Sequence, residues 1–226
     1  MANIKMRNYK LENIDIEDIE LVLQKVEDTF DFRFVNKELI KIKNLGQLSD
    51  AIKDKIKLEH KESCTTQQAF YKLKKILISQ SGLDEINPKT ELSKIFPKKN
   101  RLKLIRKVEE KLSFKLNITQ PKRVYVNILL ILFVISILSF FYDYKIALFG
   151  IIVSILGIWS THKFGKELNL KNVGDLAEKM KRENYLKSRR DPKSVNINEV
   201  EQVIIDLFSI ELNLRKSELT RKALIQ

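Results

Sequence analysis

The side chains that could perform chemistry in this sequence are few and scattered. The thiol of Cys64 lies in the polar stretch KESCTTQQ just before a predicted helix, and a helix N-terminus can lower the pKa of a thiol. No sequence-distinct base accompanies it, and His60 and His162 are isolated in the sequence. The motifs HExxH, CxxC, GxGxxG, GxxxxGK[ST] and GxSxG are all absent. We therefore expect no catalytic residue, no metal ligand and no cofactor, and we predict that the protein is not an enzyme.

Charge is the stronger chemical signal. The 226 residues include 42 Lys and Arg against 29 Asp and Glu, a formal net charge of +13. Eight Lys or Arg and two Glu fall within residues 94–111, and the stretch KRENYLKSRRDPK at 181–193 is similarly basic. This balance favours an anionic partner: lipid head groups, nucleic acid or an acidic protein. The alternative for residues 94–111 is a plain solvated helix face. Acidic pairs such as Glu109-Glu110 are predicted to be surface residues.

The elements that carry these residues are predicted to be helices. Gly and Pro are scarce, with six and four residues, while Lys, Leu, Ile and Glu dominate, a composition that favours helices over loop-rich β structure. A single cysteine cannot form an internal disulfide, which suits a reducing compartment. The start, MANIKMRNYK, has no apolar stretch typical of a cleavable signal peptide.

Two apolar runs in the middle of the chain predict a transmembrane helical hairpin over residues 123–161. The first run, VYVNILLILFVISILSFFY, has 19 uncharged residues, and the second, IALFGIIVSILGIWS, has 15. A spanning helix needs about 20 apolar residues, so the second run spans only if Tyr144 and Thr161 lie at the interface or the bilayer thins. The alternative is a hairpin buried in a soluble core. That alternative predicts a polar stripe, whereas these runs are apolar all round.

The flanking residues predict the orientation of this hairpin. Lys122, Arg123 and Lys163 flank its open end, so the positive-inside rule places both termini in the cytoplasm and the turn DYK outside. The aromatic residues at the two predicted interfaces form the expected belts: Tyr125 and Trp159 at one, Tyr142 and Tyr144 at the other. Asn127, the one clearly polar residue inside, is close enough to an interface or to the partner helix to be tolerated.

Three pairs of segments resemble one another across the chain. The phrase KNLGQL at 43–48 returns as KNVGDL at 171–176, and residues 20–34, ELVLQKVEDTFDFRF, resemble residues 102–116, LKLIRKVEEKLSFKL. In both members of the second pair, the apolar residues first recur with helical spacing and then alternate with polar ones. This pattern predicts a helix followed by an extended segment. Residues 67–95 resemble residues 194–222, with Leu73 aligned to Val200 and Thr90 aligned to Ser217.

The order of these segments predicts two helical modules. Residues 66–118 and 164–181 form one module, and the hairpin interrupts it. Residues 11–58 are the back half of the other module, and residues 195–226 are its front half. The two halves pair within one chain, as a circular permutation, or between chains, as a domain swap. The alternative is a chance likeness among helices rich in Lys, Leu, Ile and Glu.

This layout resembles that of acyl carrier proteins. KNVGDLAEKM is similar to the start of their last helix, and VEDTFDFRF to the end of their second helix. More closely, the chain resembles an uncharacterised bacterial group of carrier-like proteins, in which FPKKNR precedes the second helix and a membrane hairpin follows it. The resemblance implies an all-α fold of two carrier-like bundles, one circularly permuted or swapped, together with the hairpin.

One departure from the family changes the expected function. Carrier proteins attach 4′-phosphopantetheine to a serine at the start of the second helix, and the alignment places Ile16 and Lys98 at that position. Neither has a hydroxyl group, so neither module is expected to carry the arm, and Ser93 and Ser113 lie on the wrong side of the helix start. The basic stretch 94–111 also replaces the acidic helix that the family presents to its enzymes.

These observations predict a membrane-anchored, non-catalytic carrier-like interaction protein of the bacterial inner membrane, two-pass with both termini cytoplasmic. Expected partners are anionic lipid head groups, an acidic protein or an enzyme of lipid or envelope biosynthesis, and a second copy by domain swap. One alternative is a basic nucleic-acid-binding helical protein tethered to the membrane. It is disfavoured because the basic residues surround the helix and aromatic stacking residues are lacking. The other alternative is a lipid-metabolism enzyme with an unrecognised site.

Overall fold

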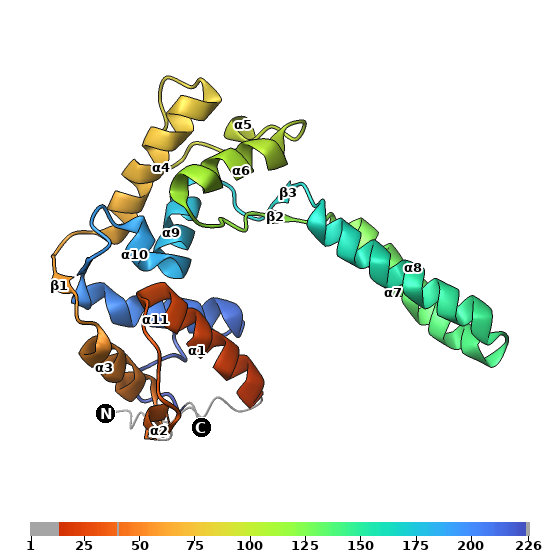
Figure 1. Cartoon of the computed structure of the whole chain (residues 1–226), viewed down its shortest axis with the longest axis horizontal. Coiled ribbons are helices and arrows are strands. Elements are labelled where there is room, and N and C mark those ends of the chain that lie inside the picture. Colours follow the sequence, from red (N-terminus) through yellow and green to blue (C-terminus); the bar gives the residue numbers. More distant parts are fainter. Residues whose placement is uncertain (1–13, 40, 225–226) are drawn as a thin grey trace, which may run out of the picture. The chain divides into compact units, whose positions relative to one another are not determined.

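The computed structural model describes residues 14–39 and 41–224, and helices dominate this part of the chain (Figure 1). The chain forms two compact units. The terminal unit contains residues up to Lys75 and from Gly174 onward, and the central unit contains Ile76–Val173. One boundary falls inside the helix Thr65–Ser81, and the other falls in the first turn of the helix Val173–Glu183. The ends of two predicted segments, 11–58 and 195–226, lie outside the described residues, as does residue 40.

The terminal unit is built on helices and a two-stranded parallel ladder. Its elements are α1 (Ile16–Phe30), α2 (Asn36–Leu39), α3 (Leu45–Lys55), β1 (Glu59–His60), the first part of α4 (Thr65–Ser81), α9 (Val173–Glu183), α10 (Tyr185–Ser188), β4 (Ser194–Val195) and α11 (Ile197–Glu211). Strand β1 pairs with β4, with Glu59 opposite Ser194. The core combines apolar residues of α1, α3 and α11: Val22, Val26, Phe30, Leu48, Ile52, Val203, Ile204, Leu207 and Phe208.

Helix α1 shows how the sequence builds this core. Its apolar residues Ile19, Val22, Val26 and Phe30 recur every three or four positions and are buried, so they form one face of a helix. The helix ends at Asp31, which adopts a left-handed conformation (φ 53°) and donates its backbone N–H to the carbonyl of Glu27. A left-handed residue of this kind closes the last helical turn.

The central unit contains the rest of α4, two further helices and the hairpin. Its elements are α5 (Leu92–Ile95), α6 (Arg101–Leu112), β2 (Thr119–Gln120), α7 (Arg123–Leu138), the 3-10 turn η1 (Ser139–Phe141), α8 (Tyr144–Lys163) and β3 (Glu167–Leu168). From the last residue of α6 onward, burial alternates: Leu112, Phe114, Leu116 and Ile118 are buried and the residues between them are exposed. The segment is not one regular strand, because Ser113 (φ 64°) and Asn117 (φ 49°) adopt left-handed conformations.

Helices α7 and α8 form the predicted hairpin (Figure 1). Both are long and apolar enough to cross a membrane, with mean hydropathies of 2.7 and 1.6 in their most apolar windows. The second apolar run, short on its own, lies in a helix of 20 residues from Tyr144 to Lys163. Only 6% of the α7 window and 11% of the α8 window is buried. The hairpin is therefore not the core of the described fold, against the soluble alternative.

Small residues bring the two hairpin helices together. A Cβ atom at Gly150 would lie 2.1 Å from the Ser136 hydroxyl oxygen, and one at Gly157 would lie 2.7 Å from a methyl carbon of Leu129. Ser136 and Ser154 are buried and donate to the carbonyls of Leu132 and Gly150 in their own helices. Helices pack this closely in membranes where small side chains let their backbones approach.

The same loop arrangement follows α1 and α6. The Glu27 carboxylate accepts the backbone N–H of Phe34 at 2.6 Å, and the Glu109 carboxylate accepts that of Leu116 at 2.8 Å. The second carboxylate oxygen lies 3.8 Å from Arg33 in the first case and 3.3 Å from Lys115 in the second. These residues correspond one to one in the alignment of 20–34 with 102–116. Glu109 is buried, so its prediction as a surface residue was wrong.

The two KNxG phrases also make the same backbone contacts. Leu45 donates its N–H to the carbonyl of Ala223, and Val173 donates to that of Thr90, both at 3.0 Å. Isolated bridges pair Asn44 with Leu224 and Glu91 with Asn172. In the terminal unit, a short connection that contains α2 leads from the loop held by Glu27 to the bridge at Asn44. In the central unit, the hairpin lies between the loop held by Glu109 and the bridge at Asn172.

The remaining alignment, of 67–95 with 194–222, was out of register. The left-handed residues that follow α4 and α11 are Gly82 (φ 68°) and Asn213 (φ 52°), which matches Leu73 to Ile204 rather than to Val200. The bridge contacts match Thr90 to Ala223 rather than to Ser217, a larger shift that lies in the loop. In the helix the shift is about one turn of 3.6 residues, which leaves the apolar face unchanged, so the sequence pattern cannot detect it.

The buried carboxylate after α6 gives a direct test of this loop. Glu109→Ala leaves the buried N–H of Leu116 without its acceptor, a cost of about 1–3 kcal/mol. Amide hydrogen exchange of residues 113–118, measured on the full chain in detergent, is expected to accelerate about tenfold. The matched control is Glu110→Ala at the exposed neighbour, which is expected to leave exchange unchanged. Equal exchange in the two variants would contradict the role of Glu109.

Candidate functional site

The two positions that the sequence resemblance aligns with a carrier serine, 16 and 98, lie at or just before the starts of α1 and α6. Ile16 is the first residue of α1 and is exposed, and Lys98 is an exposed residue three positions before α6. Ser93 is exposed on α5 and donates its hydroxyl to Glu91. Ser113 is the left-handed residue that ends α6. The structure therefore presents no hydroxyl group at either of the two carrier-serine positions.

The residues considered for chemistry do not form a cluster. Cys64 is exposed before α4, and the Nδ1 of His60 accepts the backbone N–H of Ile197. His162 is exposed in the last turn of α8. Within residues 14–39 and 41–224, no three His, Cys, Asp or Glu side chains gather in a way that could hold a metal ion.

A pocket of about 360 Å³ lies in the central unit where the hairpin joins the rest of the unit. Lys98 from the loop before α6 forms an ion pair with Glu167 of β3 at 2.6 Å. The remaining lining residues come from the start of α7, the end of α8 and the loop after it: Lys122, Tyr125, Ser160, Thr161, Phe164, Gly165 and Lys166. The hydrogen bond from Lys98 and the nearby charges of Arg101 and Lys122 lower the pKa of Glu167, which keeps this carboxylate ionised.

Arg101 and Gly165 fix the walls of this pocket. Arg101 is buried, and its guanidinium donates to the carbonyl of Phe96 at 2.8 Å and to that of Lys166. One side chain thus joins the loop that precedes Lys98 to the loop that follows α8. At Gly165 an added Cβ would lie 2.6 Å from the carbonyl carbon of Gln120, so only glycine permits this approach. Strands β2 and β3 pair beside it.

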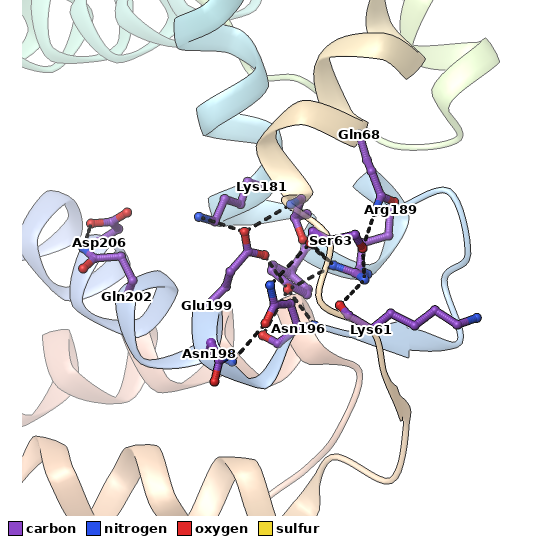
Figure 2. A network of polar contacts seen from close by, with 12 residues as sticks. Lys61, Ser63, Gln68, Lys181, Arg189, Asn196, Asn198, Glu199, Gln202 and Asp206 are labelled. Atoms are coloured by element: carbon purple, nitrogen blue, oxygen red, sulfur yellow. Dashed lines mark hydrogen bonds and ion pairs between the residues drawn. The ribbon is translucent and has the colours of Figure 1, made fainter.

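A second polar cluster lies in the terminal unit around Arg189 (Figure 2). Arg189 is fully buried, and its guanidinium donates to the hydroxyls of Thr65, Ser63 and Ser194 at 2.6, 2.9 and 3.1 Å. It also donates to the carbonyls of Ser63 and Lys61. These bonds tie the segment between β1 and α4 to the segment before β4.

Tyr185 connects Arg189 to a negatively charged residue, Glu199. The Tyr185 hydroxyl donates to the Glu199 carboxylate at 2.7 Å, and the other carboxylate oxygen accepts the N–H of Thr65 and lies 3.6 Å from Lys181. Burial raises the pKa of Tyr185 to about 12, so this hydroxyl remains a donor at neutral pH. Figure 2 shows Glu199 between Lys181 and the Arg189 cluster. A buried charge is tolerated when its hydrogen bonds are satisfied in this way.

An open groove of about 1020 Å³ runs beside the Arg189 cluster. Its cations are Lys61, Lys72, Lys75 and Arg190, and its carboxylates are Glu62 and Asp191. Lys61 is paired with Asp191 at 2.8 Å. Lys72 donates to the carbonyl of Lys187, and partial burial lowers its pKa. The groove is basic and has no group of convergent catalytic side chains.

Comparison of the chain with protein-family models, with curated proteins and with solved structures finds no match.

Sequence reasoning missed both buried arginines. Arg101 was counted in the basic stretch 94–111, and Arg189 in the basic stretch 181–193, yet both side chains are buried. Composition reports the charge of a segment and not the position of each side chain. The available signal was Tyr185 followed by Leu186, an apolar pair within an otherwise polar stretch.

Replacing Arg189 tests whether its guanidinium holds the terminal unit together. Arg189→Lys keeps the charge but removes most of the hydrogen bonds, because an ammonium lacks the planar fork of donors. We expect a loss of about 3 kcal/mol in the stability of the terminal unit, since unsatisfied buried acceptors cost about 1–3 kcal/mol each. The loss of stability is measured by urea unfolding in detergent, with hydrogen exchange of α11 as the readout. The control is Arg190→Lys, whose side chain is exposed and whose backbone N–H binds Gln68. An equal effect at both positions would refute the role of Arg189.

Proposed function

We propose that this protein is a membrane-anchored, non-catalytic interaction protein, with α7 and α8 inserted in the bilayer and carrier-like helical units beside it. The observation that carries the proposal is the exposed apolar surface of the hairpin. Large side chains along both helices are exposed, among them Ile131 (61%), Ile135 (54%), Phe149 (71%) and Ile155 (54%). Soluble proteins rarely expose apolar patches of this extent, whereas lipid covers them.

Charged and aromatic residues at the open end of the hairpin support the same proposal. The ammonium group of Lys163 lies 4.6 Å from the centre of the Trp159 ring, and that of Lys122 lies 5.8 Å from the centre of the Tyr125 ring. Amphipathic rings and lysines at helix ends are typical of a membrane interface. In this proposal the open end faces the cytoplasm of a bacterial cell, as do both termini.

The carrier-like part of the proposal is supported by the repeated contacts. The paired Glu27 and Glu109 loops and the paired KNxG bridges give the chain two copies of one local design. The bridge between Asn44 and Leu224 joins the two terminal segments, and the same pairing can form within one chain, as a circular permutation, or between two chains, as a domain swap. Without a hydroxyl at positions 16 and 98, these units act by docking on lipid-synthesis components or an acidic protein.

Membrane extraction tests the insertion of the hairpin. The full chain expressed in bacteria is expected to remain in the membrane pellet after alkaline carbonate treatment and to enter the supernatant with detergent. A variant with Ile131→Arg and Ile155→Arg is expected to be released, because a central arginine disfavours insertion by about 2.5–3.5 kcal/mol. The control is Tyr142→Arg at the exposed turn, which is expected to remain in the pellet. Release of the unmodified protein by carbonate would refute insertion.

A mass measurement tests the absence of a carrier function. The purified protein is incubated with a phosphopantetheinyl transferase and coenzyme A, and its intact mass is measured. No change is expected, because positions 16 and 98 lack a hydroxyl group. A Lys98→Ser variant shows whether a serine at this position is sufficient for modification, and a true carrier protein in the same tube confirms that the enzyme is active. An increase in the mass of the unmodified chain by one 4′-phosphopantetheine group would contradict a non-carrier role.

A further inference from the structure

The pocket at the base of the hairpin lies where a lipid head group would meet the protein. Tyr125 is in the first turn of α7, and Ser160 and Thr161 are in the last turn of α8. The exposed apolar faces of both helices begin at this level. A ligand that fills the pocket can therefore extend an apolar tail along the hairpin, if the hairpin is inserted as proposed above.

The charges of the pocket favour an anion. Three lysines, Lys98, Lys122 and Lys166, line it together with one carboxylate, Glu167. Glu167 is occupied by Lys98. Among the described residues, neither Lys122 nor Lys166 is in an ion pair with a carboxylate; the Lys122 ammonium lies 5.8 Å from the centre of the Tyr125 ring. The hydroxyls of Ser160 and Thr161 line the same pocket, although that of Thr161 donates to the carbonyl of Ile158.

The pocket is held in shape before any ligand arrives. Arg101 donates to the carbonyls of Phe96 and Lys166, and Gly165 packs so closely on Gln120 that an added Cβ would clash with its backbone. The pairing of Gln120 with Glu167 adds a third connection. Loops fixed in this way lose little freedom on binding, which favours affinity.

We propose that this pocket binds the phosphate group of an anionic phospholipid, through Lys122 and Lys166 with Lys98 beside them. The apolar rings of Tyr125 and Phe164 face the glycerol and the first acyl carbons. A volume of about 360 Å³ is at the lower end of the range for small-ligand sites, roughly 300–1,000 Å³. This is suited to a head group rather than to a whole lipid. Such basic pockets beside membrane helices select anionic head groups.

The inference rests on the proposed membrane insertion, and its experiment separates the two. Full-length protein in detergent is titrated with phosphatidylglycerol or with phosphatidylcholine of the same acyl chains, and bound lipid is counted by native mass spectrometry. The unmodified protein is expected to retain phosphatidylglycerol about tenfold better than phosphatidylcholine. The variant with Lys98→Gln, Lys122→Gln and Lys166→Gln is expected to lose this preference.

Two further variants control for folding and net charge. Arginine at the same three positions is expected to restore the preference. Glutamine at Lys43, Lys57 and Lys193, which are exposed in the terminal unit, removes the same charge and is expected to have no effect. Carbonate extraction of each variant reports insertion separately, so a failure of anchoring is distinguished from a failure of the pocket.

Three outcomes would overturn the proposal. The first is equal binding of the two lipids by the unmodified protein. The second is an equal loss of binding in the control with changes at Lys43, Lys57 and Lys193. The third is displacement of phosphatidylglycerol by millimolar inorganic phosphate, which would assign the pocket to a soluble phosphate compound.

Discussion

The hairpin imposes the main physical constraint on this protein: its apolar side chains have no protein cover. Burial of a large apolar side chain is worth roughly 1.5–3 kcal/mol, and exposed residues of this kind run along both α7 and α8. Gly150, Gly157 and Ser136 lie in the contact between the two helices and cover only the faces that the helices turn toward each other. The outer faces remain exposed, and both helices are long and apolar enough to cross a membrane.

The rest of the central unit is arranged around the entry of this hairpin. In the terminal unit a short segment with α2 connects the Glu27 loop to Asn44, whereas the hairpin occupies the corresponding place after the Glu109 loop. Strands β2 and β3 and the side chain of Arg101 join the segments at the two ends of the hairpin. The same junction creates the basic pocket.

The sequence predicted the elements whose periodicity is strong and failed where single side chains decide the structure. The helices, the hairpin and the correspondence of Glu27 with Glu109 followed from apolar spacing. The match of α4 to α11 slipped by one turn, because the apolar face repeats with the helix. The burial of Arg101 and Arg189 was missed, since each depends on carbonyls from segments far away in the chain, and only the apolar pair Tyr185-Leu186 near Arg189 hinted at it. The function expected from the carrier-like layout remains a proposal.

Labelling of cysteines tests the central claim most directly. Cys64 is the one cysteine of the chain and is exposed, so it reports the side of the membrane on which the terminal unit lies. A membrane-impermeant maleimide applied to spheroplasts should modify Cys64 only after permeabilisation. In a Cys64→Ser background, Tyr142→Cys in the turn should be modified in intact spheroplasts. Modification of both sites only after permeabilisation, or of both in intact spheroplasts, would contradict a spanning hairpin.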